Sequence, residues 1–488
     1  MIEMGILEHP IMRKELAKLG IAEVFVAGPF DNWQTASNNE EANRAVDALI
    51  KSFAEDSGYR ELNVAPVIPM GHSAAATFPW NFAAWNPQRT LAILSIHGDA
   101  PETDRTGNSR PNADWGERNI DGIPGLMVMG EYEWWDDRLL PALKFRGAHP
   151  KTPLAMLAEP GNGHFNYCDQ LVQFLAMFIH KAVEARLPAD EALDRAPVLK
   201  PVDPAKGWLV QRWHLNQRRT IEPAPFAKYR GSAKEAFWAF DKEMAWAIQN
   251  YFGDQPGKLP QLIGFVQDGK MVTQTESMEQ VRLKFEPLDD GVTFHLQPKF
   301  LESVESGSKN MARWTYLPVG SPLGHASGGG PIQIHKITGP VKQVGATTFA
   351  ASLDRLNSTV DRRNLDMWLW ANHPGDEKYK SIVQQVMIKI PPFSEGAEQH
   401  ITFPPIPDQL AGARSVELRA TSDSKRKVYY YVREGPAEIE GDQLKLTKIP
   451  PRAKLPVAVT VVAWQLGRDA EPKWQTATPV DRTFLIRK

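Results

Sequence analysis

The first 190 residues alternate short apolar runs with amphipathic stretches. The apolar runs are residues 22–27, 64–70, 91–96, 125–129 and 152–158. The stretches that separate them carry apolar residues at helical spacing, at 9–19, 39–57, 74–85 and 165–185. Strands that are apolar throughout are typical of a parallel sheet covered by helices on both faces. The sequence therefore predicts an α/β domain over residues 1–195.

The rest of a chain of 488 residues is long enough for further domains. A Pro-rich stretch at 197–205 marks a boundary, and residues 196–256 are predicted to form an extension with a helix at 232–252. Short alternating strands between Gly, Pro and Asp turns predict a β-rich domain at 257–397. Its glycine cluster, 327–330, lacks the strand-to-helix context of a phosphate-binding loop, which favours a turn.

Residues 398–488 contain regularly spaced short strands, which predicts a β-sandwich. The expected strands are 400–404, 416–419, 427–432, 444–447, 457–464 and 483–486. The unit also resembles a bacterial immunoglobulin-like repeat over nearly all of its length. The residues that carry the resemblance are Ile401-Thr402-Phe403, Ile406-Pro407-Asp408, Tyr429-Tyr430-Tyr431-Val432, Gly435-Pro436-Ala437, Thr478-Pro479-Val480 and Phe484. The resemblance implies a spacer or adhesion module.

Composition excludes several classes of partner. The formal net charge of -2 gives no electrostatic reason to expect nucleic acid. The single cysteine, Cys168, can form neither a disulfide within the chain nor a cysteine-rich zinc cluster. No apolar run approaches the roughly 18 residues that a membrane helix needs. We expect no metal, no cofactor, no nucleic-acid partner and no membrane span.

The segment Gly71-His72-Ser73-Ala74-Ala75 follows an apolar run and precedes a helix of small residues. A serine on such a strand-to-helix turn has a strained backbone and an exposed hydroxyl, and its crowded neighbours must be small. Gly71 and Ala75 meet that requirement. Ser73 is therefore the predicted nucleophile, and the amide of Ala74 a predicted oxyanion donor. The alternative interpretation is that Ser73 only caps the helix.

The predicted general base is His164, in a Gly161-Asn162-Gly163-His164 loop after the last apolar run. An imidazole on such a loop can reach a serine and accept its proton. His72 is expected to pack beside the turn and help to shape the substrate site. For His97 we favour a structural role over a place in the pocket.

The predicted acid lies in the loop after 125–130, which reads Glu131-Tyr132-Glu133-Trp134-Trp135-Asp136-Asp137. A carboxylate that follows a strand-ending glycine by three residues selects Glu133, whereas Glu131 and Asp137 remain open alternatives. Trp134 and Trp135 are candidate substrate-binding residues, and packing against the sheet edge is an equal alternative.

With these motifs, residues 21–185 resemble the later part of an α/β-hydrolase catalytic domain, in which the triad order is also Ser, acid, His. The resemblance implies an esterase, lipase or peptidase that works through an acyl-serine. The chain departs from the family at its front, where a strand and the loop that supplies the second oxyanion amide are expected. Residues 1–7 are the only candidate remnant, so we expect an N-terminally truncated domain whose signal peptide could be lost with it.

The leading functional hypothesis is a carboxylic-ester hydrolase, periplasmic or extracellular in its natural context, with a small-molecule or polysaccharide-linked ester as substrate. The alternative is a non-catalytic, multidomain surface-binding protein with a degenerate hydrolase scaffold. A peptidase is a third option, for which the sequence carries no specific mark.

Overall fold

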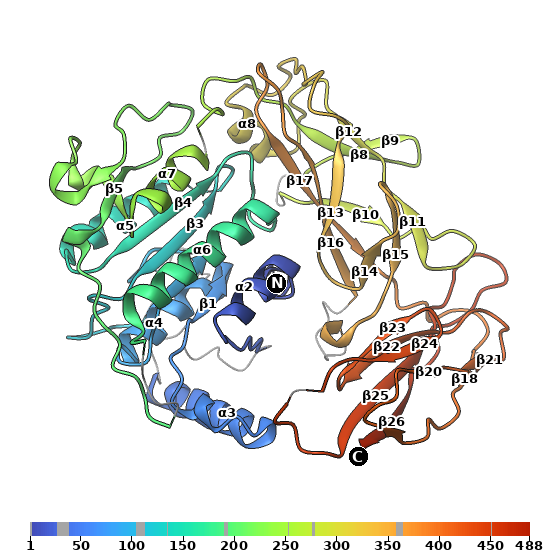
Figure 1. Cartoon of the computed structure of the whole chain (residues 1–488). Coiled ribbons are helices and arrows are strands. Elements are labelled where there is room, and N and C mark those ends of the chain that lie inside the picture. The colour runs from blue at the N-terminus through green and yellow to red at the C-terminus, as the bar shows by residue number, and fades with distance from the viewer. Residues whose placement is uncertain are drawn as a thin grey trace.

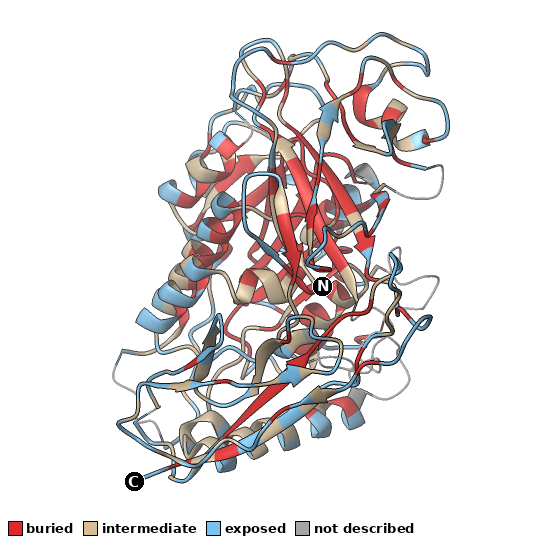
Figure 2. Ribbon diagram, turned by 90° about the vertical axis from the view of Figure 1, so that its right-hand side faces the viewer, coloured by how far each residue is buried: buried red, intermediate tan, exposed pale blue. Residues whose placement is uncertain are grey.

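The computed structural model describes residues 2–26, 39–103, 113–133, 135–189, 194–251, 253–275, 279–357, 365–449 and 451–488. Figure 1 shows an α/β part beside two β-strand parts, with the two N-terminal helices between them. Figure 2 shows that buried residues concentrate in the central strands.

The α/β part is built on a four-stranded, fully parallel sheet of order β1-β2-β3-β4. Its strands are β1 (Met70–His72), β2 (Ile93–Ile96), β3 (Gly125–Gly130) and β4 (Leu154–Glu159). Its helices are α1 (Ile2–Leu7), α2 (Pro10–Lys18), α3 (Asn39–Ser57), α4 (Phe78–Trp85), α5 (Trp135–Ala148) and α6 (Asp169–Arg186). Strands β2, β3 and β4 are buried at every position, as a sheet covered on both faces requires. Parallel strands place their carboxyl ends along one edge, where β1, β3 and β4 each run into a loop that carries a candidate site residue.

Three predicted elements at the front are wrong or shifted. Residues 22–26 form no strand, and Val24 and Phe25 are 49% and 41% exposed; Ala27 lies outside the described residues. The expected strand at 64–70 begins only at Met70, because the residues before it make a single bridge at Val67. The strand remnant sought in residues 1–7 is the helix α1 where the structure describes it.

The extension after the α/β part is a mixed unit. Strands β5 (Trp208–Gln211), β6 (Ala224–Pro225) and β7 (Ala236–Ala239) form a small antiparallel sheet, followed by α7 (Lys242–Tyr251). The predicted helix at 232–252 is therefore wrong in its first half, where β7 lies; Phe252 lies outside the described residues. Strand β7 and helix α7 both contact β4, so this unit continues the first hydrophobic core.

In the residues that the structure describes, the β-rich part contains three sheets and one α-helix, and its hydrophobic core also includes Tyr132, Trp464 and Leu466. Their orders are β10-β17-β16-β13, β11-β15-β14 and β12-β8-β9. The elements are β8 (Ile263–Gln267), β9 (Lys270–Val272), β10 (Val281–Lys284), β11 (Thr293–His295), β12 (Pro298–Phe300), α8 (Lys309–Thr315), β13 (Gln333–Thr338), β14 (Val341–Gln343), β15 (Thr348–Ala351), β16 (Asp366–His373) and β17 (Ile382–Lys389).

The C-terminal part is a β-sandwich. One layer has the order β19-β26-β25-β22, the facing strands are β20-β24-β23, and β18 pairs with β21. The strands are β18 (Ile401–Thr402), β19 (Gln409–Leu410), β20 (Ser415–Glu417), β21 (Thr421–Ser422), β22 (Tyr429–Glu434), β23 (Ala437–Glu440), β24 (Gln443–Leu446), β25 (Val457–Trp464) and β26 (Val480–Arg487). Phe403, Leu444, Val459 and Phe484 are buried in the core between the layers.

Candidate active site

Ser73 lies on a sharp turn between β1 and a helix. Strand β1 ends at His72, Ser73 has a φ of +58°, and a 3₁₀ turn over Ser73–Thr77 leads into α4. A positive φ is strained for a serine, and the strain persists because the flanking elements fix the backbone. A Cβ on Gly71 would lie 2.1 Å from the Ala75 carbonyl oxygen, so only glycine fits there. The turn leaves Ser73 partly exposed.

His164 lies on the loop after β4 and meets Ser73 across 91 positions of sequence. Its Nε2 is 2.7 Å from the Ser73 Oγ, and its side chain is only 10% exposed. On the other side, the His72 ring is buried and its Nε2 bonds the His164 carbonyl oxygen at 2.7 Å. His72 therefore packs behind the base and holds the backbone of its loop.

Glu133 is the carboxylate that His164 contacts. Its Oε1 accepts the His164 Nδ1 at 2.5 Å and the Arg138 Nη1 at 2.8 Å. Its Oε2 accepts the His97 Nδ1 at 2.6 Å and the Gly130 amide at 2.8 Å. Because a carboxylate can only accept, the His164 proton is on Nδ1, and Nε2 is free to accept the Ser73 proton. Ser73, His164 and Glu133 thus form a continuous hydrogen-bonded chain.

The two alternative acids lie elsewhere. Glu131 is buried, but it accepts the Gly161 amide at 2.8 Å and forms an ion pair with Lys380 at 2.9 Å. It therefore ties the acid loop to the loop that carries His164. Asp137 is exposed in α5. Neither has a hydrogen bond to His164 among the contacts of the described residues.

Electrostatics prepare Glu133 to stay ionised. Burial alone would raise its pKa, but His97, Arg138 and His164 outweigh burial and hold the pKa of Glu133 well below its ordinary range. Burial lowers the pKa of His164, and the attraction of Glu133 offsets this only in part. A neutral imidazole beside an ionised carboxylate is the state that a general base needs.

Three charged residues of this cluster escaped the sequence analysis as site residues. His97 follows β2 and contacts Glu133, Arg138 comes from the first turns of α5, and Glu159 ends β4. The signal that could have found them is their position, because each follows or ends a buried parallel strand, or faces such an end from a helix. His97 has the buried, structural position that we favoured for it, but it bonds the acid directly.

The β-rich part contacts both loops of the site. The Tyr132 ring stacks on Trp314 of α8 with centroids 4.4 Å apart, and its carbonyl oxygen accepts from Trp314 Nε1 and Arg313 Nη2. The Val383 amide of β17 donates to the Gly161 carbonyl at 3.0 Å. Residues 257–397 therefore hold the acid loop and the base loop from outside the α/β part.

The structure describes two of the remaining predicted site residues, Ala74 and the backbone of Trp135, and adds Glu3 beside the turn. Ala74 follows Ser73 within the 3₁₀ turn, so its amide lies at the start of that turn. The outer edge of β1 carries the Glu3 carboxylate, whose Oε1 accepts the His72 amide at 2.9 Å. Trp134 lies outside the described residues, and Trp135 begins α5.

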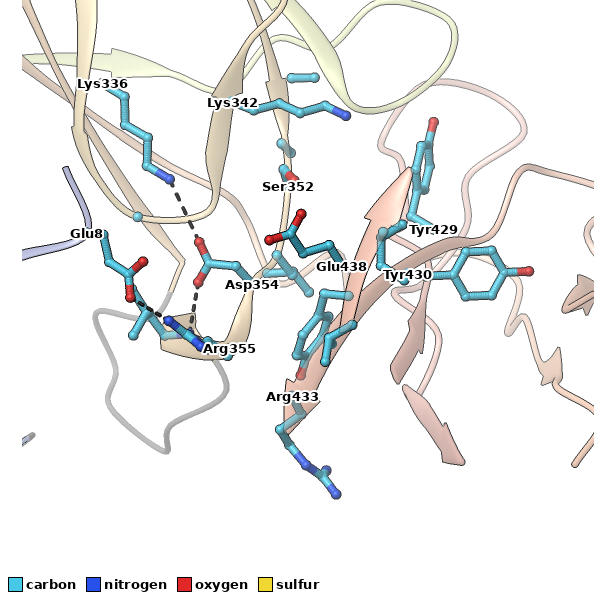
Figure 3. Close-up of a pocket in the computed structure, with 18 of the residues that line it drawn as sticks. Glu8, Lys336, Lys342, Ser352, Asp354, Arg355, Tyr429, Tyr430, Arg433 and Glu438 are labelled. Carbon is cyan, nitrogen blue, oxygen red and sulfur yellow. Dashed lines mark hydrogen bonds and ion pairs between the residues drawn. The ribbon is translucent and has the colours of Figure 1, made fainter. Parts of the chain in front are cut away.

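A cavity of about 980 Å³ opens between α1, β13–β15 and the β-sandwich. Figure 3 shows charged side chains on its walls, with Lys336 paired to Asp354 and Arg355 paired to Glu8. Ser73 does not line it, but α1 does, and Tyr167 of the His164 loop lies in its wall. Helix α1 contacts both β1 and β13, so it lies between the strand that leads to Ser73 and the wall of the cavity.

Known proteins give little guidance. No family model and no curated protein matches the chain. Solved structures that overlap it include mouse cadherin-23 EC22-24, at 13% identity over 46% of this chain and 67% of that one, with a TM-score of 0.14. Fibronectin(III)-like modules of Clostridium thermocellum CbhA share 10% identity over 46% and 94%, with a TM-score of 0.14. The N-terminal Ig1-2 module of Drosophila DLAR shares 8% over 32% and 83%, with a TM-score of 0.17.

At TM-scores this low the overlaps carry no argument, and the β-sandwich rests on its own strand pairing. Within the described ranges, no group of three or more His, Cys, Asp or Glu side chains is arranged to hold a metal ion. In the same residues no helix is both long and apolar enough to cross a bilayer.

Proposed function

We propose that this protein is a serine hydrolase of the α/β-hydrolase type that cleaves a carboxylic ester. The observation that carries the proposal is the chain from the Ser73 Oγ through the His164 imidazole to the Glu133 carboxylate, with heavy-atom distances of 2.7 and 2.5 Å. The parallel sheet, the strained serine between strand and helix, and the order Ser, Glu, His support the fold assignment.

In the proposed reaction the Ser73 Oγ attacks the ester carbonyl carbon while its proton passes to the His164 Nε2. Glu133 stabilises the resulting imidazolium, and the Ala74 amide donates to the oxyanion. When the C–O bond breaks, His164 gives the proton to the leaving alcohol, and an acyl-serine remains. Water then attacks the acyl group, with His164 again taking and returning a proton, and releases the acid.

A polysaccharide-linked ester is the proposed substrate class, and the cavity on the far side of α1, which Ser73 does not line, is the proposed site for a sugar unit remote from the ester. Tyr429 and Tyr431 line it together with charged side chains, a mixture suited to a polyhydroxylated ligand. An exported location is proposed with it, since the β-sandwich is typical of spacer modules on extracellular proteins.

One observation favours the alternative, a non-catalytic binding protein with a degenerate scaffold. The Glu3 carboxylate sits on the outer edge of β1, one residue before the nucleophile, where the resemblance would place a second oxyanion donor. An anion there opposes rather than stabilises a developing negative charge.

Labelling with a fluorophosphonate, followed by mass spectrometry of the peptides, decides between the two. The hydrolase proposal predicts a phosphonyl group on Ser73 of the full chain and none on Ser73→Ala. Ser52→Ala is the control, because Ser52 lies in α3 and its hydroxyl bonds the Leu49 carbonyl oxygen of the same helix. A folded native protein that remains unlabelled would favour the binding protein. A panel of acetyl, feruloyl and aryl esters and short peptides then defines the substrate.

A further inference from the structure

A second histidine shares the triad acid. His97 follows β2, is fully buried, and has a φ of +50°, an uncommon value for any residue other than glycine. Its Nδ1 bonds the Glu133 Oε2 at 2.6 Å, and its Nε2 lies 3.5 Å from the Glu159 Oε2. A side chain in that strained backbone position is thus held between two buried carboxylates.

The chain of contacts continues beyond His97. The Glu159 Oε1 accepts the hydroxyl of Tyr251, the last residue of α7, at 3.1 Å. The Tyr251 oxygen in turn lies 3.8 Å from the Cys168 Sγ, at the start of α6. Successive contacts therefore lead from Tyr251 through Glu159, His97, Glu133 and His164 to Ser73.

The charges around His97 indicate its protonation state. Glu133 and Glu159 face its two nitrogens, Arg138 of α5 donates to its carbonyl oxygen at 3.1 Å, and the rings of His72 and His164 lie 5.7 and 6.0 Å away. Asp99 pairs with Arg138 at 3.5 Å. Burial lowers the pKa of His97, but the two glutamates outweigh burial and the pKa is raised. Burial raises the pKa of Glu159 to about 7.

We propose that His97 is a positioning residue for the hydrolase reaction: as a buried imidazolium bonded to Glu133, with Glu159 facing its other nitrogen, it draws charge from the acid and keeps His164 neutral in mildly acidic solution. The inference rests on the proposed function. A carboxylate that already bonds an imidazolium and a guanidinium attracts a proton on His164 less strongly. The base then works at a lower pH than it would with Glu133 bonded to His164 alone.

His97→Asn tests the role of the charge. Asparagine tolerates a positive φ and can still donate to Glu133, but it carries no charge and cannot reach Glu159. With one cation gone, Glu133 stabilises protonated His164 more strongly. The acid limb, which is the pH at which the Ser73 labelling rate falls as His164 becomes protonated, should therefore rise by roughly half to one pH unit. Below that limb, labelling would slow by roughly 3- to 10-fold. An acid limb that stays in place, or moves down, in the folded variant would overturn the proposal.

His373→Asn is the matched control. His373 is a buried histidine of β16, in a different sheet from the triad strands, and it bonds backbone atoms of Gly330 and Gly375. Its replacement should leave the acid limb unchanged. A shift as large as that of His97→Asn would show that loss of any buried histidine moves the profile.

Nitrogen-15 NMR of the histidine rings gives an answer that needs no activity and no His97 variant. In the full-length protein, His97 should keep both ring protons through the pH range in which His164 is neutral. In Glu159→Gln it should lose one of them at lower pH, since a neighbouring anion is gone. A neutral His97 at pH 6 refutes the proposal even if Ser73 labels, whereas a protonated His97 with an unreactive Ser73 refutes the hydrolase function instead.

Discussion

Lys380→Met should destabilise the protein because it leaves a buried anion without its cation. The Lys380 Nζ lies 2.9 Å from the Glu131 Oε1, and the two side chains are 4% and 2% exposed. Removal of one partner of a buried ion pair costs about 3–5 kcal/mol. The Gly161 amide still donates to the other oxygen of Glu131, so we expect a loss near 3 kcal/mol.

Urea unfolding at pH 7, followed by tryptophan fluorescence, measures this loss, and labelling of Ser73 in the same samples reports on the site. Glu131 joins the acid loop to the base loop, so labelling should fail at lower urea than the loss of global fluorescence. In a double-mutant cycle, Glu131→Gln combined with Lys380→Met should cost less than the sum of the single changes, because the double variant leaves no buried charge.

Lys284→Met provides the comparison within the same β-rich part. Lys284 lies 3.6 Å from Asp268, and both side chains are more than 60% exposed, so its loss should leave the unfolding midpoint in place. The reasoning would be refuted if Lys380→Met unfolded at the wild-type urea concentration, or if the two changes of the cycle were additive.

Two further predictions concern the acid and the turn. Glu133→Gln should reduce the labelling rate roughly 10,000-fold, as loss of the triad acid does elsewhere. Glu131→Gln leaves Lys380 without its anion and should lower stability, but in the absence of urea it should label near the wild-type rate, because it keeps an acceptor for the Gly161 amide. Equal losses in an ester-hydrolysis assay without urea would contradict the assignment. Gly71→Ala places a Cβ 2.1 Å from the Ala75 carbonyl oxygen, so stability should fall by about 1–3 kcal/mol in urea and labelling with it. Gly147→Ala, with open space around its Cβ, should change neither, and a stable, reactive Gly71→Ala would disprove the steric argument.

Local sequence pattern predicted the parts of the fold that local forces decide. The expected strands at 91–96, 125–129 and 152–158 correspond to β2, β3 and β4, because uninterrupted apolar runs have few alternatives to a buried sheet. The run at 22–27 is interrupted by Glu23, residues 22–26 pair with no strand among the described residues, and Val24 and Phe25 are exposed. Strand pairing is a long-range contact, and composition alone does not reveal it.

The site residues also divide into those that adjacent sequence predicts and those that depend on distant contacts. Ser73 and His164 were predicted because their surroundings, a crowded turn and a glycine-rich loop, are written in adjacent residues. The choice of Glu133 over Glu131 depends on which carboxylate points toward His164. The direction of each side chain is set by the folded conformation of the loop, which the sequence of the loop does not reveal. His97 looked structural because its partners, Glu133 and Glu159, are distant in sequence.

The β-rich part shows why a triad cannot be judged from its three residues alone. Trp314 and Arg313 hold Tyr132, which lies between Glu131 and Glu133 in the sequence, and β17 bonds the loop of His164 at Gly161. The acid loop and the base loop are both irregular backbone, and irregular backbone keeps a fixed geometry only where other elements over-determine it. Several of the elements that do so here come from residues 257–397. The distance between the His164 Nε2 and the Ser73 Oγ therefore depends in part on contacts made by residues 257–397, which contain no triad residue.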